Sequence, residues 1–170
     1  FKLKDTEDVL KVFTTRCDTL YGVTFMVMSP EHPFLEKYQD RIKNIDELKA
    51  YQDAAKAKSE IERTDESKEK TGIKLDGLEA VNPVSGEVIP IYVSDYVLAG
   101  YGTGAIMAVP AHDTRDYAFA KKFGIKIIPV IEGGDISKEA YTGDGVHINS
   151  GVLDGLGKED AINTCLKYLE

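Results

Sequence analysis

Two acids, Asp113 and Asp116, stand three residues apart at the start of a helical pattern that ends at Gly124. This spacing has the form of a capping box, in which the first acid is the N-cap and the second stands at N3. Both carboxylates would then satisfy unpaired backbone amides and the helix dipole. Asp116 has an alternative, because at N3 its side chain can turn outward and hold an ammonium through a charge-assisted hydrogen bond. For Asp113, capping and a role in a site both stay open.

Three threonines crowd into the loop TTRCDT at 14–19, together with Arg16 and Asp18. Strand propensity alone explains Thr14. Three hydroxyls beside an arginine and an aspartate are more typical of a polar pocket on a loop. Such hydroxyls can bond a ribose, a carbonyl or a water, each as donor or acceptor. This loop is therefore a second candidate for chemistry.

Cys17 and His112 raise the alternative of a Cys/His hydrolase, with Cys17 as nucleophile and Asp113 beside the base. Adjacent residues rarely place a base and its orienting acid correctly, so a packing role for His112 is favoured. The glycine-rich GYGTG at 100–104 matches neither GxGxxG nor the P-loop, and a strand rather than a helix is expected after it. No phosphate-binding loop is predicted there.

The composition disfavours several classes of protein. A net charge of −8 is opposite to that of a chain that grips nucleic acid through its phosphates. Any nucleic-acid role must be confined to a few nucleotides or depend on a partner. Two cysteines without CxxC spacing predict neither a disulfide framework nor a zinc site, and indicate a reducing cytoplasm. His32, His112 and His147 lie too far apart for a local metal-ligand pattern. No apolar run approaches the roughly 20 residues that span a bilayer.

Strands dominate the expected interior. We expect strands at 9–14, 23–29, 103–110 and 126–132, and a hairpin with arms at 78–83 and 87–94 in which Pro90 indicates an edge or a bulge. We expect helices at 33–39, from 46 to about 59, at 113–124 and at 157–170, the last with Ile162, Cys165, Leu166 and Leu169 on one face. The charged segment 62–72 is expected to be a solvated helix end or loop. This order lacks the regular alternation of a doubly wound sheet, so an antiparallel or mixed barrel with peripheral helices is favoured.

Taken together, the segments TTRCDTLYGVTF (14–25) and NPVSGEV…KKFGI (82–125) resemble the editing domain of bacterial-type leucyl-tRNA synthetases. The resemblance runs over nearly the whole chain. The part AVPAHDTRDYAFA (108–120) is specific, because isoleucyl and valyl relatives share the threonine-rich loop and the GTG strand but differ after them. One departure is Cys17, which stands where the family usually shows a proline. Because proline fixes φ, this difference concerns the stiffness of the loop.

The resemblance implies a mixed β/α fold, a small closed β-barrel with peripheral helices, and a single editing domain over residues 1–170 that belongs to a larger leucine-tRNA ligase. It implies post-transfer editing, in which water hydrolyses the ester that joins norvaline, isoleucine or methionine to tRNA(Leu). No cofactor is expected in this domain; ATP and magnesium would serve the active site of the parent synthetase. The implied partners are the 3′-terminal adenosine of the aminoacylated tRNA and the rest of the synthetase. A cytoplasmic monomer without membrane contact is expected.

The resemblance also implies roles for single residues. Asp116 would hold the α-amino group of the mischarged amino acid, and Thr14 and Thr15 would lie around the scissile ester and the terminal adenosine. Thr19 would form the wall that excludes leucine. The other substrate-binding positions implied are Arg16 and Asp113 as supports, Tyr101, Met107 and Val109 as pocket lining, and His112. Two alternatives stay open, namely a module that only binds the tRNA 3′ end and a small-ester hydrolase that uses Cys17 and His112.

Overall fold

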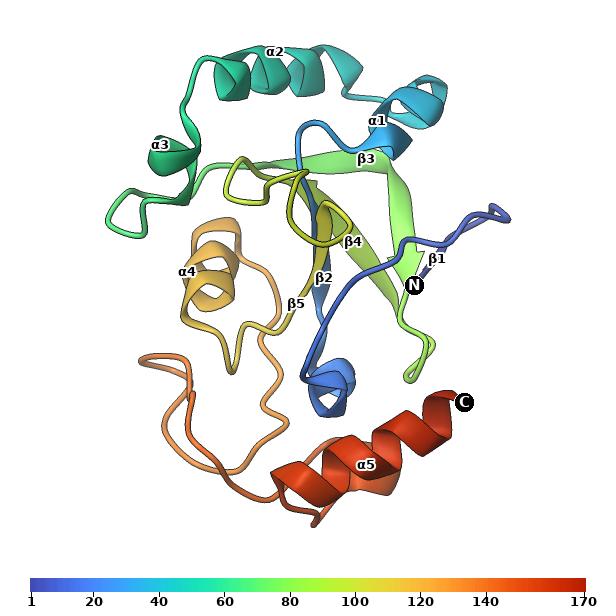
Figure 1. Ribbon diagram of the computed structural model, residues 1–170, viewed down its shortest axis with the longest axis vertical. Helices are drawn as coiled ribbons and strands as arrows, with labels where there is room; N and C mark the ends of the chain where they lie inside the picture. The colour runs from blue at the N-terminus through green and yellow to red at the C-terminus, as the bar shows by residue number, and fades with distance from the viewer. The chain divides into compact units, whose positions relative to one another are not determined.

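The computed structural model describes residues 1–170, which fall into two compact units. The first unit holds residues 1–13 and 25–107, and the second holds residues 14–24 and 108–170. The prediction of a mixed β/α fold with peripheral helices is confirmed. The sheet, which the resemblance implied to be a small closed barrel, is a curled half-barrel of five strands (Figure 1). None of the helices is both long enough and apolar enough to cross a membrane.

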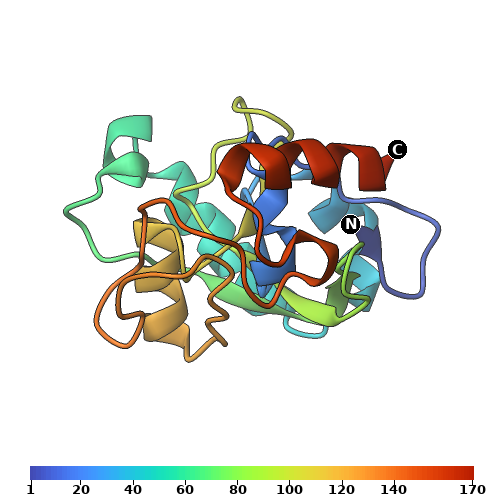
Figure 2. The same ribbon diagram turned by 90° about the horizontal axis from the view of Figure 1, so that it is seen from below.

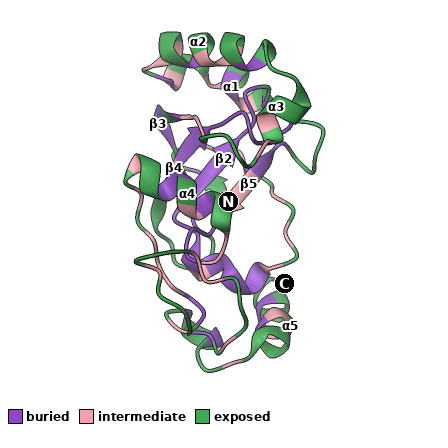
Figure 3. Cartoon of the chain, turned by 90° about the vertical axis from the view of Figure 1, so that its left-hand side faces the viewer, coloured by how far each residue is buried: buried purple, intermediate pink, exposed green.

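The sheet has the strand order β1-β3-β4-β2-β5. Its strands are β1 (Lys2–Leu3), β2 (Phe25–Met28), β3 (Ile73–Val81), β4 (Val88–Val93) and β5 (Ala105–Ala108). β2 pairs in parallel with β4, whereas β3 is antiparallel to both β1 and β4. All four residues of β2 are 0% exposed (Figure 3). Its unbroken apolar run is typical of a central strand that is covered on both faces.

The predicted hairpin is confirmed as β3 and β4. Asn82 shapes its turn, because the side-chain oxygen accepts a hydrogen bond from the backbone amide two residues on (3.0 Å). The register shifts between Lys74 and Glu79, where Gly77 has a φ of +104°. Pro90 pairs with Glu79 at the end of this irregularity. Pro90 therefore marks a bulge rather than an edge, since β4 lies between β3 and β2.

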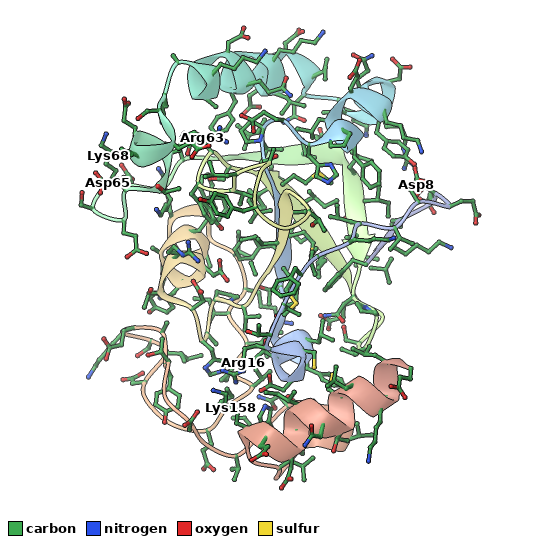
Figure 4. All side chains as sticks on the ribbon, in the orientation of Figure 1. Asp8, Arg16, Arg63, Asp65, Lys68 and Lys158 are labelled. Atoms are coloured by element: carbon green, nitrogen blue, oxygen red, sulfur yellow. The ribbon has the colours of Figure 1, made fainter.

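The helices of the first unit are α1 (Pro33–Lys37), the 3-10 helix η2 (Gln39–Arg41), α2 (Ile45–Lys56) and α3 (Glu60–Thr64). The predicted helices in these regions are confirmed. α2 packs against β3 and buries Leu48 and Ala55 (Figure 1). The charged segment 62–72 contains the end of α3, as expected. Arg63, labelled in Figure 4, anchors it by donating hydrogen bonds to the carbonyls of Asp95 (2.7 Å) and Val97 (3.1 Å).

Two predicted strands are wrong. Segment 9–14 alternates exposed residues with the buried Leu10 and the half-buried Val12 and Thr14, but it forms only an isolated bridge at Val9. Segment 126–132 forms only an isolated bridge at Ile131. Hydropathy alternation predicts which side chains face the interior, but a strand also needs a partner along its whole length.

The second unit contains the 3-10 helix η1 (Cys17–Gly22), α4 (Thr114–Phe123), the 3-10 helix η3 (Gly151–Leu153) and α5 (Lys158–Leu169). α5 contacts both 3-10 helices (Figure 2). The predicted apolar face of α5 is only partly right. Cys165 is buried, but Ala161 shares its face, while Leu166 is 51% and Leu169 47% exposed. The second half of the loop expected at 14–19 belongs to η1.

Candidate functional site

Asp113 is the N-cap of α4, as predicted. One carboxylate oxygen of Asp113 accepts hydrogen bonds from the backbone amides of Arg115 (2.9 Å) and Asp116 (3.0 Å). At the other end Gly124, with a φ of +67°, ends the helix in the left-handed conformation. The cap satisfies two amides that the helix leaves unpaired.

Asp116 stands in the first turn of α4 and is only 6% exposed. Its Oδ2 accepts a hydrogen bond from the backbone amide of Val109 (3.0 Å), which follows β5. Its carboxylate therefore ties the end of the strand to the start of the helix. A negative charge in this first turn is stabilised by the helix dipole.

Arg16 is the centre of the threonine loop. Its backbone amide donates to Oγ1 of Thr14 (3.0 Å), and its carbonyl accepts from both Oγ1 (2.8 Å) and the amide of Thr19 (3.1 Å). Thr19 is 4% exposed, whereas Thr15 is exposed. The hydroxyl of Thr19 is therefore committed to the backbone, and its methyl group points in one fixed direction.

The Arg16 side chain, labelled in Figure 4, forms a bidentate ion pair with Asp18, with Nε to Oδ1 and Nη2 to Oδ2 both at 2.9 Å. Asp18 is 0% exposed and also contacts Nε2 of His147 at 2.8 Å. Burial alone would raise the pKa of Asp18, but hydrogen bonds from Arg16 and His147 outweigh it, so that this pKa lies below its ordinary value. Sequence reasoning missed His147, because no local pattern relates it to Asp18.

His112 is bonded to backbone groups on both sides of its ring. Nδ1 lies 2.7 Å from the Tyr141 carbonyl and must donate to it, while Nε2 accepts from the amides of Val130 (3.0 Å) and Ile131 (3.1 Å). Burial is the largest influence and lowers the pKa of His112, which keeps the ring neutral. Neither ring nitrogen is left for a substrate, so the expectation that His112 contacts the substrate is not supported. Its hydrogen bonds explain why 130–131 does not join a sheet.

The two cysteines pack together at α5. Sγ of Cys17 points to the Ile162 carbonyl (3.8 Å), and Sγ of Cys165 donates to the Cys17 carbonyl (3.1 Å). Burial, followed by contact with Cys17, raises the pKa of Cys165 to about 12. With Cys17 facing α5 and both nitrogens of His112 occupied, the geometry does not support a Cys/His nucleophile pair.

The threonine loop and the residues before α4 are held together inside the second unit. The amide of Thr24 donates to the Ala108 carbonyl (3.3 Å). At Gly22, a Cβ atom would lie 3.2 Å from a methyl group of Val109 and 3.0 Å from one of Val130. This close approach favours glycine, because a Cβ would have to push these methyl groups aside, and it places the end of η1 beside Val109.

The remaining predicted pocket residues, Tyr101 and Met107, belong to the first unit. Tyr101 is 70% exposed in the loop at 100–104, and Met107 lies in β5. No three His, Cys, Asp or Glu side chains gather so that they could hold a metal ion.

Comparison with known proteins bears on both units. A family model described as "Leucyl-tRNA synthetase, editing domain" matches residues 1–170. A crystal structure of a ternary complex, the agnB2 LeuRS-tRNA-LeuAMS complex from Agrobacterium radiobacter, is similar to the chain with 34% sequence identity and a TM-score of 0.64. The similarity covers 80% of this chain and 16% of that chain, so the chain corresponds to a small part of that LeuRS.

Proposed function

The chain belongs to the family of leucyl-tRNA synthetase editing domains, and on this premise we propose that it hydrolyses the ester that joins norvaline, isoleucine or methionine to tRNA(Leu). Editing of this kind is needed because one methylene in an apolar pocket discriminates by only about 1–3 kcal/mol, so that a second, differently shaped site must remove the errors. In this proposal residues 1–170 are the editing domain of a larger synthetase.

The observation that carries the proposal is the buried carboxylate of Asp116 beside Val109. Asp113 already caps α4, so Asp116 is not needed as the N-cap. A carboxylate held in this way suits the α-ammonium group of an aminoacyl ester, because a charge-assisted hydrogen bond is stronger than a neutral one. Binding the ammonium here would place the amino acid side chain near Val109, which we assign to the pocket lining.

Thr19 is the residue that we assign to the exclusion of leucine. Its hydroxyl is bonded to the Arg16 carbonyl at 2.8 Å, so its orientation is fixed. A rigid, β-branched side chain makes a wall that does not yield to an oversized substrate. We place Thr14 and Thr15 around the ester and the terminal adenosine. Arg16 would stabilise the threonine loop, and Asp113 would stabilise the start of α4.

Water is the nucleophile in this proposal. It adds to the ester carbonyl carbon, the bond to the ribose oxygen breaks, and that oxygen takes a proton, which releases the free amino acid and intact tRNA. No thiol is placed to attack, since Cys17 faces the Ile162 carbonyl. An aminoacyl ester is already reactive, so holding it against a positioned water can supply much of the acceleration.

The acidic charge of the chain, −8, fits a domain that reads only the 3′-terminal adenosine. The rest of the synthetase would grip the tRNA, and ATP and magnesium would act at its separate active site. We expect a monomeric enzyme of the cytoplasm.

The proposal is tested by the deacylation of isoleucyl-tRNA(Leu), leucyl-tRNA(Leu) and isoleucine ethyl ester by the synthetase that carries this domain. We expect hydrolysis of the isoleucyl-tRNA alone. Tight binding of isoleucyl-tRNA without hydrolysis would establish the binding-only alternative. Efficient hydrolysis of the ethyl ester would establish a general esterase that does not need the adenosine.

A further inference from the structure

A buried ion pair joins the threonine loop to a distant part of the second unit. Oδ2 of Asp18 and Nε2 of His147 lie 2.8 Å apart although the residues are 129 positions apart in the chain. Asp18 is 0% and His147 1% exposed. Burying ionisable groups is costly unless they are paired and fully hydrogen-bonded. Such a pair beside the proposed site therefore calls for a functional explanation.

Both ring nitrogens of His147 face acceptors. Nε2 faces the Asp18 carboxylate, and Nδ1 lies 2.9 Å from the Leu156 carbonyl oxygen. Neither a carbonyl nor an ionised carboxylate can donate a hydrogen, so a hydrogen bond at either contact is donated by the His147 ring. The ring of His147 is therefore held between two acceptors, whereas Nε2 of His112 accepts from two backbone amides.

The backbone of His147 is held as firmly as its ring. Its amide donates to the Leu156 carbonyl (2.9 Å), and its carbonyl accepts from the Gly155 amide (2.8 Å). On the other side it forms a bridge with Ile131, whose amide donates to Nε2 of His112 (3.1 Å). Backbone contacts therefore connect His147 through Ile131 to His112, the residue just before the α4 cap.

From Asp18 the connection continues to Thr19. The bidentate pair fixes the Arg16 side chain, and the Arg16 carbonyl accepts hydrogen bonds from both the backbone amide and the hydroxyl of Thr19. We infer that His147 is a positioning residue for specificity: by holding Asp18, and through it the Arg16 backbone, it fixes the place of Thr19 at the side-chain pocket. This inference rests on the proposed function, in which Thr19 excludes leucine.

The test compares His147→Phe with the parent synthetase in single-turnover deacylation of leucyl-tRNA and isoleucyl-tRNA. Phenylalanine keeps the ring volume but removes both donors. We expect the ratio of leucyl to isoleucyl deacylation to rise about tenfold or more, which is the low end of discrimination by one methylene. His147→Gln, which can still donate to Asp18, should raise the ratio less, and it decides the question if the phenylalanine variant does not fold.

Leu153→Ala is the matched control, because Leu153 is 1% exposed on η3 and has no polar atom that could bond Asp18. It should lower the melting temperature and leave the ratio unchanged. In the double variant His147→Phe with Asp18→Asn, the ratio should be no higher than in Asp18→Asn alone, since both act through one contact.

Parental ratios in both His147 variants would overturn the inference, and so would an equal rise of the ratio in Leu153→Ala. A parent enzyme that does not deacylate isoleucyl-tRNA at all would be a different result. It would overturn the proposed function, and the inference with it.

Discussion

The carboxylate of Asp113 accepts a hydrogen bond from the backbone amide of Asp116 (3.0 Å), which gives the two acids at the start of α4 different partners. Asp113 caps α4, whereas Asp116 accepts a hydrogen bond from the Val109 amide in the chain after β5. We expect Asp113→Ala to lower the free energy of unfolding by about 0.5–2 kcal/mol, the usual cost of losing an N-cap. Deacylation of isoleucyl-tRNA should continue below the melting temperature. Chemical denaturation measures the loss of stability, and a deacylation assay of the same variant measures the retained activity. An Asp113→Ala protein of parental stability that no longer deacylates isoleucyl-tRNA would contradict a purely structural role of Asp113.

Thr19 should control which side chains enter the pocket. Thr19→Ala removes the wall, so we expect the synthetase to deacylate leucyl-tRNA that its parent spares. Thr19→Tyr should fill the pocket and stop deacylation of norvalyl- and isoleucyl-tRNA alike. Opposite outcomes from opposite changes in size cannot result from general damage to the fold.

Thr19→Val is the matched control for this pair, because it keeps the branched shape and loses only the hydroxyl that bonds the Arg16 carbonyl. It should still spare leucyl-tRNA, because the backbone amide at position 19 still donates to the Arg16 carbonyl (3.1 Å) and a β-branched side chain is stiff at χ1. If Thr19→Ala spares leucyl-tRNA as the parent does, the wall lies elsewhere, near Val109.

Cys17 should be dispensable for hydrolysis. Its thiol points to the Ile162 carbonyl on α5, away from any base. We expect Cys17→Ala to deacylate isoleucyl-tRNA at a rate close to that of the parent, with the melting temperature lowered by the loss of packing against α5. A folded Cys17→Ala protein whose activity falls to background would revive the thiol mechanism.

Folding stability should fall as the pH drops below about 6.5. Burial lowers the pKa of His112 from its ordinary value of 6.5. Just below pH 6.5 the imidazole is therefore protonated in the unfolded chain but stays neutral in the folded protein, which favours unfolding. The stabilisation is complete above pH 6.5 and is lost as the pH falls toward the lowered pKa. Urea unfolding at several pH values between about 5 and 8, the range in which histidine titrates, measures the slope of the free energy of unfolding against pH.

His112→Gln should flatten that slope, because glutamine can accept from the backbone without titrating. His32 in the first unit also has a pKa lowered by burial. His32→Gln is therefore measured in parallel, and it should remove a separate part of the pH dependence of the free energy of unfolding. An unchanged slope in His112→Gln would show that the ring does not titrate with folding.

Local signals account for the parts of the fold that sequence could predict. The Asp113 cap, the stop at Gly124 and the turn at Asn82 each depend on hydrogen bonds or backbone angles within a few residues. The buried run of β2 is likewise visible as an unbroken apolar stretch. Such features need no knowledge of the rest of the chain.

Long-range contacts account for what sequence could not predict. Segment 126–132 has the pattern of a strand, but two of its amides bond His112, 18 and 19 residues away. His147 looked like an isolated histidine, and only the fold brings it to Asp18. On α5 the buried face depends on where η1 packs, which periodicity does not encode. The polar composition of the threonine loop is visible in the sequence, whereas the contact between Asp18 and His147 is not.

The central claim is that the charge of Asp116 binds the ammonium group of the mischarged amino acid. Asp116→Asn tests it most directly, because an amide oxygen can still accept from the Val109 backbone while the charge is gone. Single-turnover deacylation of isoleucyl-tRNA should slow by about ten- to a hundredfold, as expected for the loss of a hydrogen bond to a charged group. The free energy of unfolding should change little, and Asp113→Asn should keep most of the rate. Deacylation by Asp116→Asn at the parental rate, in a protein of parental stability, would contradict the account.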